Sequence, residues 1–216
     1  MNTYNYRGLA LLKNNGIEYN KVKLYCIVHD IPHKVYSRHQ LIDTGYVPIC
    51  GSVEWVELQL GKSITPDYYP RWLSRHLYRD VWKCGECYFE QKTFIKPADR
   101  YKRFNGTIVD GYFEKESPPF VCSQVITFVD EFRYYITNGK VVDCGWYAGK
   151  QETIIPPQIN IAIPEYFCGA VDFGITDDGK FALVESQHPY ACGWYADDIK
   201  AYIQWCIDGW NYIECL

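Results

Sequence analysis

The sequence lacks both a long apolar segment and an excess of positive charge. No hydrophobic run approaches the roughly 20 residues that a membrane-spanning helix needs. Near the N-terminus the one apolar block is Leu9–Leu12, which is shorter than the core of a secretory signal, so we expect a cytoplasmic protein with no membrane partner. The 22 Lys and Arg are outnumbered by 26 Asp and Glu, a net charge of −4, which argues against a general nucleic-acid binder.

The sequence also lacks the spacing of a complete zinc site. Its ten cysteines are too sparse for a disulfide scaffold, and we expect reduced, mostly buried thiols. Cys84 and Cys87 are the one pair at metal-ligand spacing, but no second CxxC and no HxxxH is present. His76 and Cys50 are the residues that could complete such a site. A zinc-stabilised interaction protein therefore stands as an alternative interpretation.

What the sequence has is enough apolar material for a core and an uneven distribution of charge. Hydrophobic residues make up 48% and aromatic residues 17%, which excludes a disordered chain and fits one domain or two closely packed lobes. Residues 71–103 hold nine Lys or Arg against four Asp or Glu, whereas residues 143–216 hold three against eleven. Such a pair of segments suits a site for a phosphate and a cation, although two solvated faces would have the same composition.

Three segments give clear signals for secondary structure. Basic residues recur every fourth position from Arg71 to Lys83, which predicts an amphipathic helix entered through Pro70. Residues 93–97 read as a strand that ends at Lys96, and a buried ammonium group there needs an anionic partner. Asp197 and Asp198 open a C-terminal helix that we expect to stop near Gly209.

A first hairpin is predicted by Asn138-Gly139, because both residues tolerate the positive φ of a tight turn. Strands are expected on both sides of this turn, over 133–137 and 140–143, and residues 125–129 suggest a connected strand. Side chains alternate along a strand, so Glu131, Arg133 and Tyr135 are expected on one face.

A second hairpin is centred on residues 177–180, and closing it places Asp172 directly opposite Glu185, with Gln187 on the same face. Like charges directly opposite in a sheet repel. A cation between them would remove this repulsion, and two carboxylates with an amide oxygen are ligands suited to Mg²⁺. The alternative is that one carboxylate leaves through a bulge or pairs with an arginine.

The pentapeptide Cys-Gly-Trp-Tyr-Ala occurs twice, at 144–148 and at 192–196. Nothing around the two copies repeats, so the sequence does not indicate a duplicated domain. No Ser-His-Asp or Cys-His pair at local spacing stands out either.

These motifs, in this order from about Phe94 to His188, resemble the ATP-grasp enzymes. The resemblance implies that Lys96 contacts the nucleotide phosphates and that Lys102 lies in the loop that covers them. It implies an adenine-reading hinge at Ser123, Gln124, Val125 and Ile126. Glu131 falls where the family binds ribose, and Arg133 where it meets the transferred phosphoryl group. Asp172, Glu185 and Gln187 resemble the family's metal ligands.

The combination of one arginine with two lysines, and segment 47–56 upstream, is similar to a phage-associated clade of this family. The resemblance implies an α+β protein of the ATP-grasp fold that holds its nucleotide between two α+β lobes. We expect a small N-terminal lobe at residues 1–88 and the ATP-grasp domain at residues 89–216. A phage-encoded protein of this kind would act in the host cytoplasm.

The implied activity is that of a carboxylate–amine ligase that uses ATP and Mg²⁺ and forms an amide through an acyl phosphate. Its partners would be a carboxylate substrate and an amine acceptor, each a small molecule, a peptide or a protein end. Two departures favour an alternative, an ATP-binding module without ligase activity. Gln187 replaces the family's asparagine, and the covering loop, residues 99–106, has a single glycine.

Overall fold

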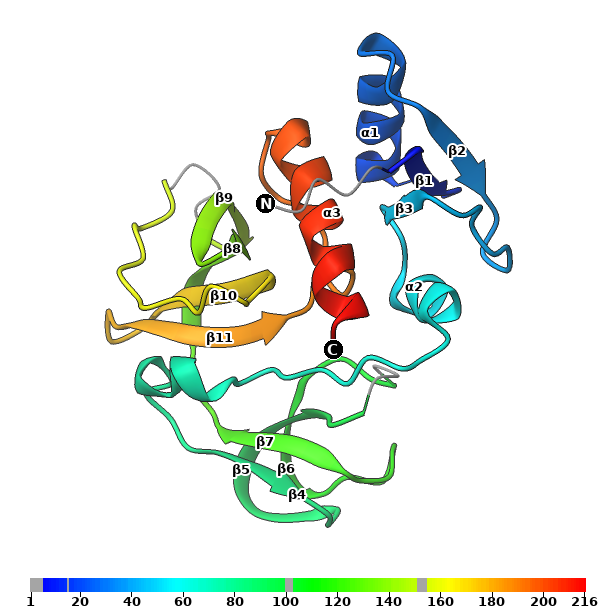
Figure 1. Ribbon diagram of the computed structural model, residues 1–216. Helices are drawn as coiled ribbons and strands as arrows, with labels where there is room; N and C mark the ends of the chain where they lie inside the picture. The colour runs from blue at the N-terminus through cyan, green and yellow to red at the C-terminus, as the bar shows by residue number, and fades with distance from the viewer. Residues whose placement is uncertain (1–5, 15, 100–102, 151–154) are drawn as a thin grey trace.

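The computed structural model describes residues 6–14, 16–99, 103–150 and 155–216. Its strands form three sheets, and helix α3 (Ile199–Glu214) runs through the middle of the molecule (Figure 1). A three-stranded sheet lies at the upper right of this view, a four-stranded sheet lies at the left, and another four-stranded sheet lies at the bottom. The mixture of helices and sheets confirms the predicted α+β class.

The N-terminal sheet is parallel, with the strand order β2-β1-β3. Its strands are β1 (Gly8–Leu12), β2 (His33–Tyr36) and β3 (Tyr46–Ile49), and every residue of β1 is buried, as is typical of a central parallel strand. Helix α1 (Ile17–Val28) connects β1 to β2, and α2 (Val53–Leu60) follows β3. The hydroxyl of Ser52 accepts a hydrogen bond from the backbone of Trp55 and so caps α2.

The lower sheet is antiparallel, with the order β4-β7-β5-β6. It contains β4 (Val81–Cys84), β5 (Tyr88–Pro97), β6 (Thr107–Tyr112) and β7 (Phe120–Gln124). The strand predicted over 93–97 is confirmed as the end of β5. Because β4 belongs to this sheet, the sheet begins within the segment that was assigned to the N-terminal lobe.

The helix predicted over residues 71–83 is wrong. Arg71–His76 form a short 3₁₀ helix, η1, and the chain then turns at Tyr78, where φ is +51°, and enters β4. The guanidinium of Arg79 donates hydrogen bonds to the carbonyl oxygens of Leu183 (2.6 Å) and Val184 (2.9 Å). These long-range bonds, with the pairing of β4 to β7, outweigh the local helical period.

The third sheet is also antiparallel, with the order β11-β10-β8-β9. Its strands are β8 (Phe128–Thr137), β9 (Lys140–Gly149), β10 (Gly169–Thr176) and β11 (Phe181–Gln187). The turn between β8 and β9 is the predicted one, with φ of +50° at Asn138 and +70° at Gly139. The strand expected over 125–129 begins only at Phe128, so residues 125–127 connect β7 to β8.

The predicted register of the second hairpin is confirmed at its functional end, where Asp172 pairs with Glu185 and Ala170 with Gln187. Near the turn the register differs by one residue, because Phe181 faces Ile175 rather than Thr176. An irregularity between Asp172 and Phe173 absorbs this shift. The facing of the two carboxylates therefore depends on a bulge that the turn rule did not contain.

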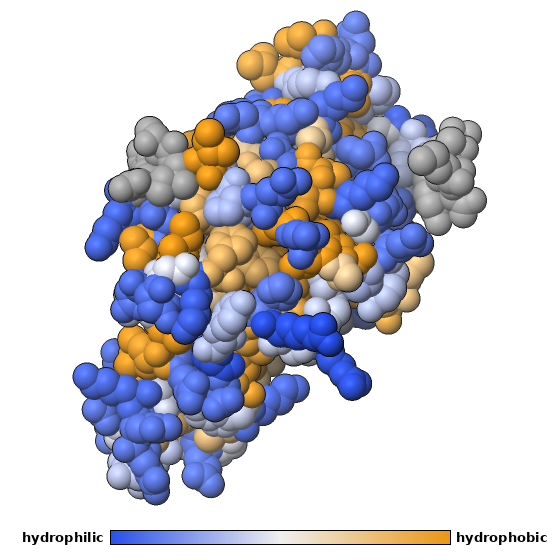
Figure 2. Space-filling model, turned by 90° about the vertical axis from the view of Figure 1, so that its left-hand side faces the viewer, coloured by the Kyte–Doolittle hydropathy of each residue, from blue (hydrophilic) through white to orange (hydrophobic). Residues whose placement is uncertain are grey.

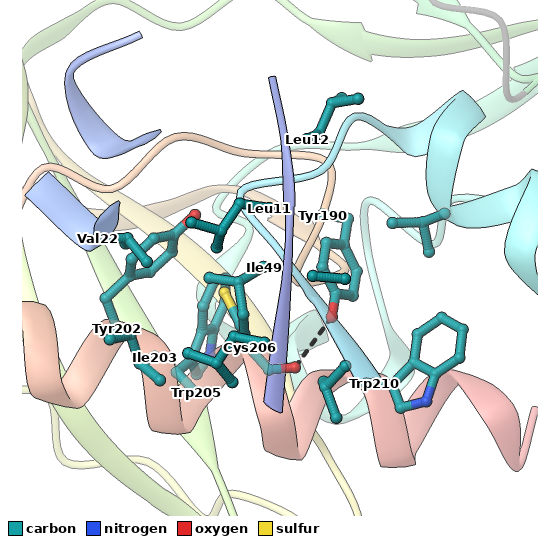
Figure 3. Close-up of a cluster of buried hydrophobic side chains, with 14 of the residues drawn as sticks. Leu11, Leu12, Val22, Ile49, Tyr190, Tyr202, Ile203, Trp205, Cys206 and Trp210 are labelled. Atoms are coloured by element: carbon teal, nitrogen blue, oxygen red, sulfur yellow. Dashed lines mark hydrogen bonds between the residues drawn. The ribbon is translucent and has the colours of Figure 1, made fainter. Parts of the chain in front are cut away.

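The largest core joins the N-terminal sheet to the C-terminal helix (Figure 3). Leu11 of β1 and Ile49 of β3 pack near Tyr202, Trp205 and Cys206 of α3. The buried hydroxyl of Tyr190 donates hydrogen bonds to the carbonyl oxygens of Pro48 (2.8 Å) and Cys206 (3.0 Å). The two ends of the chain thus share one core.

Helix α3 is the C-terminal helix that the sequence predicts. The Asp198 side chain caps it by accepting hydrogen bonds from the backbone of Lys200 (2.8 Å) and Ala201 (3.0 Å). The stop expected near Gly209 is wrong, because the helix continues to Glu214. A Cβ at Gly209 would lie 2.6 Å from the ring of Pro189, so this glycine serves close packing instead.

The surface is mixed in character. Figure 2 shows apolar side chains gathered in the middle of one face and hydrophilic residues over much of the lower part, where Figure 1 places β4–β7. In the described segments, no helix is both long enough and apolar enough to cross a membrane. All ten cysteines are free, as expected, but only four are buried and Cys215 is exposed.

Candidate functional site

A cavity of about 250 Å³ lies between the two four-stranded sheets. Its wall contains six of the residues that the sequence assigns to the nucleotide and one assigned to the metal: Lys96, Ser123, Gln124, Val125, Ile126, Glu131 and Glu185. Apolar and cationic side chains complete the wall: Tyr69, Arg79, Phe94, Ile108, Phe128 and Val184. The structure therefore brings together residues that are up to 89 positions apart in the chain.

Lys96 lies at the end of β5 and is 6% exposed. Its Nζ donates a hydrogen bond of 2.7 Å to Oε2 of Glu185 and lies 3.7 Å from the ring centroid of Tyr68. The anionic partner that a buried lysine requires is therefore a carboxylate of the opposite sheet. Both charges are in place at the polar end of the cavity.

The predicted hinge follows the end of β7. Ser123 and Gln124 are still part of that strand, and Gln124 holds Asp80 through both its backbone N–H (3.2 Å) and its side-chain oxygen (3.0 Å). Val125 and Ile126 lie between β7 and β8, so their peptide groups are outside both ladders. An extended backbone that lines a cavity in this way can present hydrogen-bonding groups to a ligand.

Glu131 lies in β8 on the same wall. The hydroxyl of Tyr147, from the neighbouring strand β9, donates a hydrogen bond to its carboxylate. Burial raises the pKa of Glu131, and the Tyr147 hydrogen bond opposes that rise. Tyr147 also contacts Arg133, which confirms that Glu131 and Arg133 share one face of the sheet.

Arg133 forms a buried ion pair with Asp172. The Nε and Nη2 atoms donate hydrogen bonds of 2.7 Å and 2.6 Å to the two carboxylate oxygens, and the residues are 5% and 0% exposed. Burial raises the pKa of Asp172 to about 6 and the arginine opposes this rise, so the carboxylate is ionised at neutral pH. Arg133, Asp172 and Glu185 are aligned across the adjacent strands β8, β10 and β11.

The structure therefore selects the alternative that the sequence left open, in which a carboxylate pairs with an arginine. Asp172 is held by Arg133, and Glu185 is held by Lys96. The repulsion expected between the two facing carboxylates is relieved by these two side chains. The four charges sum to zero.

The predicted metal ligands lie together but form a small set. Gln187 donates a hydrogen bond from its amide to Glu185, so the donors present are two carboxylates and one amide. In the parts of the chain that are described, no group of three or more His, Cys, Asp or Glu could hold a metal ion. This finding contradicts the zinc alternative at Cys84 and Cys87, and it leaves Asp172, Glu185 and Gln187 as a prediction. Lys102 lies outside the described residues.

Sequence reasoning missed several residues of the site, of which Arg79 is the clearest. It was expected on the solvated face of a helix, but its guanidinium lies 5.4 Å from the ring centroid of Tyr69 and 5.8 Å from that of Phe128. Its carbonyl partners are more than a hundred residues away along the chain. No local pattern carries that information.

A second cavity, of about 440 Å³, opens at the carboxyl ends of β1 and β3. Its wall includes Lys13 and Arg38, Ser52 at the start of α2, and Cys192. Cys192 is followed by Gly193, whose carbonyl oxygen lies 3.4 Å from Nη1 of Arg133. Residues 192–193 thus connect the wall of this cavity with Arg133. The carboxyl edge of a parallel sheet, beside a change in strand order, is a usual place for a ligand.

Solved structures with the same fold extend over nearly the whole chain. The ATP-grasp ligase PsnB complexed with its minimal precursor is 9% identical and has a TM-score of 0.51, with 94% of this chain and 98% of that chain covered. A RimK domain ATP-grasp protein from Sphaerobacter thermophilus DSM 20745 is 11% identical with a TM-score of 0.50, covering 96% and 98%. PsnB has also been solved with a precursor variant, Mg and ADP, again with a TM-score of 0.50, at 9% identity and covering 94% and 98%.

These likenesses confirm the predicted ATP-grasp fold. A comparison with curated protein sequences gave no match. One family model matches residues 76–205, a range that contains every predicted site residue; it describes the ATP-grasp domain, family 2 of the clade named for one arginine and two lysines. Since this match covers more than half of the chain, the protein belongs to that second family of the arginine-and-two-lysine clade of ATP-grasp domains.

Proposed function

We propose that this protein is an ATP-dependent ligase that joins a carboxylate to an amine. The observation that carries the proposal is the convergence of Lys96, the 123–126 hinge, Glu131 and Glu185 on one cavity. ATP-grasp ligases use ATP and Mg²⁺, and a structural neighbour, PsnB, has been solved with Mg and ADP. The proposed substrates are a carboxylate and an amine, and the acyl phosphate, like the phage association, is part of the proposal.

The residues present fit a nucleotide. Phe94, Ile108 and Phe128 give the cavity apolar walls for a base, and the peptide groups of Val125 and Ile126 lie beside it. Glu131 offers a carboxylate for ribose hydroxyls, and Lys96 marks the phosphate end. A volume of about 250 Å³ suits the base and sugar, so the phosphates would extend past Lys96 toward Arg133.

The donor set also fits Mg²⁺, which prefers oxygen ligands. Asp172 and Glu185 would hold the ion, with Gln187 as the third candidate. When bound, Mg²⁺ would neutralise charge on the phosphate oxygens. Lys96 and Arg133 would then turn from the carboxylates to the phosphates. Each of the four protein charges exchanges one opposite charge for another, so no buried charge is left unpaired.

The proposed reaction has two steps. An oxygen of the substrate carboxylate attacks the terminal phosphorus of ATP, the bond to ADP breaks, and an acyl phosphate forms. The amine nitrogen then attacks the acyl carbon, phosphate leaves, and the nitrogen loses a proton to give the amide. Phosphoryl transfer needs positioning and charge neutralisation more than covalent help, and Lys96, Lys102 and Arg133 are the cations assigned to that task. The 440 Å³ cavity near Gly193 is the proposed place of the substrate.

Calorimetric titration tests the nucleotide part of this proposal. ATP should bind to the full chain with Mg²⁺ and much more weakly without it, and GTP should bind more weakly than ATP. ADP release in mixtures of candidate acids and amines then tests the ligase part. Absence of ATP binding in either condition would remove the central claim.

One observation favours a second candidate, an ATP-binding module without ligase activity. Arg133, the residue assigned to the transferred phosphoryl group, is already bound by both oxygens of Asp172. If that ion pair persists with Mg²⁺-ATP bound, nucleotide will bind but ADP will not be released with any acid and amine.

A further inference from the structure

The repeated pentapeptide comes together at Arg133. One copy, at 144–148, lies in β9, and the other, at 192–196, follows β11. The rings of Tyr147 and Tyr195, the fourth residue of each copy, have centroids 5.4 Å apart. The Cζ atom of Arg133 lies 4.9 Å from the first centroid and 5.4 Å from the second. The two rings, called here the tyrosine pair, therefore both contact the guanidinium.

The glycines of the two copies make this approach possible. Gly145 faces Arg133 in the register of β8 and β9, and a Cβ there would collide with the carbonyl oxygen of Tyr195. The Gly193 carbonyl oxygen accepts hydrogen bonds from Nη1 of Arg133 (3.4 Å) and from the hydroxyl of Tyr135 (2.8 Å). That same hydroxyl accepts a hydrogen bond of 2.7 Å from the backbone of Tyr195. Each copy thus supplies a glycine and a tyrosine to one seat for Arg133.

The hydrogen bonds of Arg133 show why the seat matters. Of the five N–H groups that a guanidinium carries, two are donated to Asp172 and one to Gly193. Within the described residues the other two have no partner. If Asp172 turns to a metal ion, Arg133 loses both of its charge-assisted bonds. The ring faces of the tyrosine pair would still attract the cation, because that contact uses none of its N–H groups.

We propose that Tyr147 and Tyr195 are positioning residues, which keep Arg133 in place while its N–H groups exchange Asp172 for the transferring phosphoryl group. This inference rests on the proposed function. Tyr147 has a second task, because its hydroxyl also holds Glu131, the residue assigned to ribose. The tyrosine pair therefore connects the sugar end of the site with the phosphoryl end.

Four variants separate the ring from the hydroxyl. Tyr195→Leu and Tyr147→Leu remove a ring face, whereas Tyr195→Phe and Tyr147→Phe keep the ring. Tyr166→Leu is the matched control, because Tyr166 is an exposed tyrosine outside the cavity wall. If a leucine variant does not fold, methionine at the same position takes its place, since it fills the volume without an aromatic face.

The readout needs no knowledge of the acid or the amine. Aluminium fluoride with Mg²⁺-ADP occupies the position of the transferring phosphoryl group, so its effect on ADP affinity reports whether Arg133 is in place. In the parent, fluoride should tighten ADP binding. Each leucine variant should lose about tenfold of this gain, with ADP affinity alone changed by less than about twofold for Tyr195→Leu. Tyr195→Phe should keep the gain, and Tyr147→Phe should keep it while binding ADP more weakly.

The outcomes distinguish the two proposals. If the parent does not bind Mg²⁺-ADP, the proposed function fails. If the parent binds ADP and gains affinity with fluoride, but the leucine variants keep that gain in full, the positioning role is overturned. A parent that binds ADP without any gain from fluoride also overturns it, because Arg133 then does not meet the transferring group. A loss of the gain in Tyr166→Leu would overturn it as well, since the effect would not be specific to the pair.

Discussion

Replacing Asp172 with asparagine removes one charge from the buried ion pair with Arg133. Asp172 is 0% exposed, Arg133 is 5% exposed, and two hydrogen bonds of 2.7 Å and 2.6 Å connect them. The facing of Asp172 and Glu185 alone would predict that Asp172→Asn is neutral or slightly stabilising. The structure reverses that sign, because the variant leaves a buried guanidinium without its counter-charge.

The size of the loss follows from the same geometry. Breaking a buried pair by removing one partner costs about 3–5 kcal/mol in the free energy of unfolding. Burial raises the pKa of Asp172 to about 6 even beside Arg133, so the pair does not fully offset the desolvation of the carboxylate. We therefore expect the lower end, about 3 kcal/mol. For a chain of this length that corresponds to a melting temperature lower by roughly 6–12 °C.

The assay is thermal and urea unfolding without Mg²⁺ or nucleotide. Asp178→Asn is the matched control, because Asp178 forms an ion pair with Lys180 in which both side chains are about half exposed. It should leave the unfolding transition in place. Arg133→Met should also destabilise, and the double variant Arg133→Met/Asp172→Leu should lose much less than the sum of the single losses. An Asp172→Asn protein that melts at or above the parent temperature would refute the ion pair.

Three further predictions concern binding and reactivity. Lys96→Met should weaken Mg²⁺-ATP binding by about tenfold or more, because the lysine is the cation at the phosphate end; an unchanged dissociation constant by calorimetry would remove Lys96 from the site. A proton competes with Mg²⁺ for Asp172 below its raised pKa of about 6, so Mg²⁺-ATP affinity should fall as the pH drops through 6; a flat calorimetric profile between about pH 5 and 8 would contradict this. Burial raises the pKa of Cys50 to about 12, so iodoacetamide at about pH 8 should modify exposed Cys215 far faster, and equal rates by mass spectrometry would argue against that burial.

Features set by a few neighbouring residues could be predicted from the sequence. Asn138-Gly139 specifies its turn because both residues adopt positive φ, and the strands on either side follow. The alternation of side chains then places Glu131 and Arg133 on one face. The strand ending at Lys96 was likewise visible as an apolar run with a terminal charge. The ATP-grasp fold was recognised from the order of such motifs rather than from any one of them.

Features that depend on distant strands could not be predicted. The helical period over 71–83 was overridden by the pairing of β4 with β7 and by the hydrogen bonds of Arg79 to β11. The partners of the two facing carboxylates were also undetermined, since hairpin arithmetic places Asp172 and Glu185 together but does not say which cations are near.

The sequence by itself determined the local turns, the strand faces and the pairing of Asp172 with Glu185. Only the tertiary structure decided that β8 lies beside β10, which brings Arg133 to Asp172, and that the two sheets meet where Lys96 reaches Glu185. It also decided that the two copies of Cys-Gly-Trp-Tyr-Ala meet at one arginine. The physical reason is that turn and strand preferences depend on a few adjacent residues, whereas the partner of a buried charge depends on strand order, which the whole chain sets.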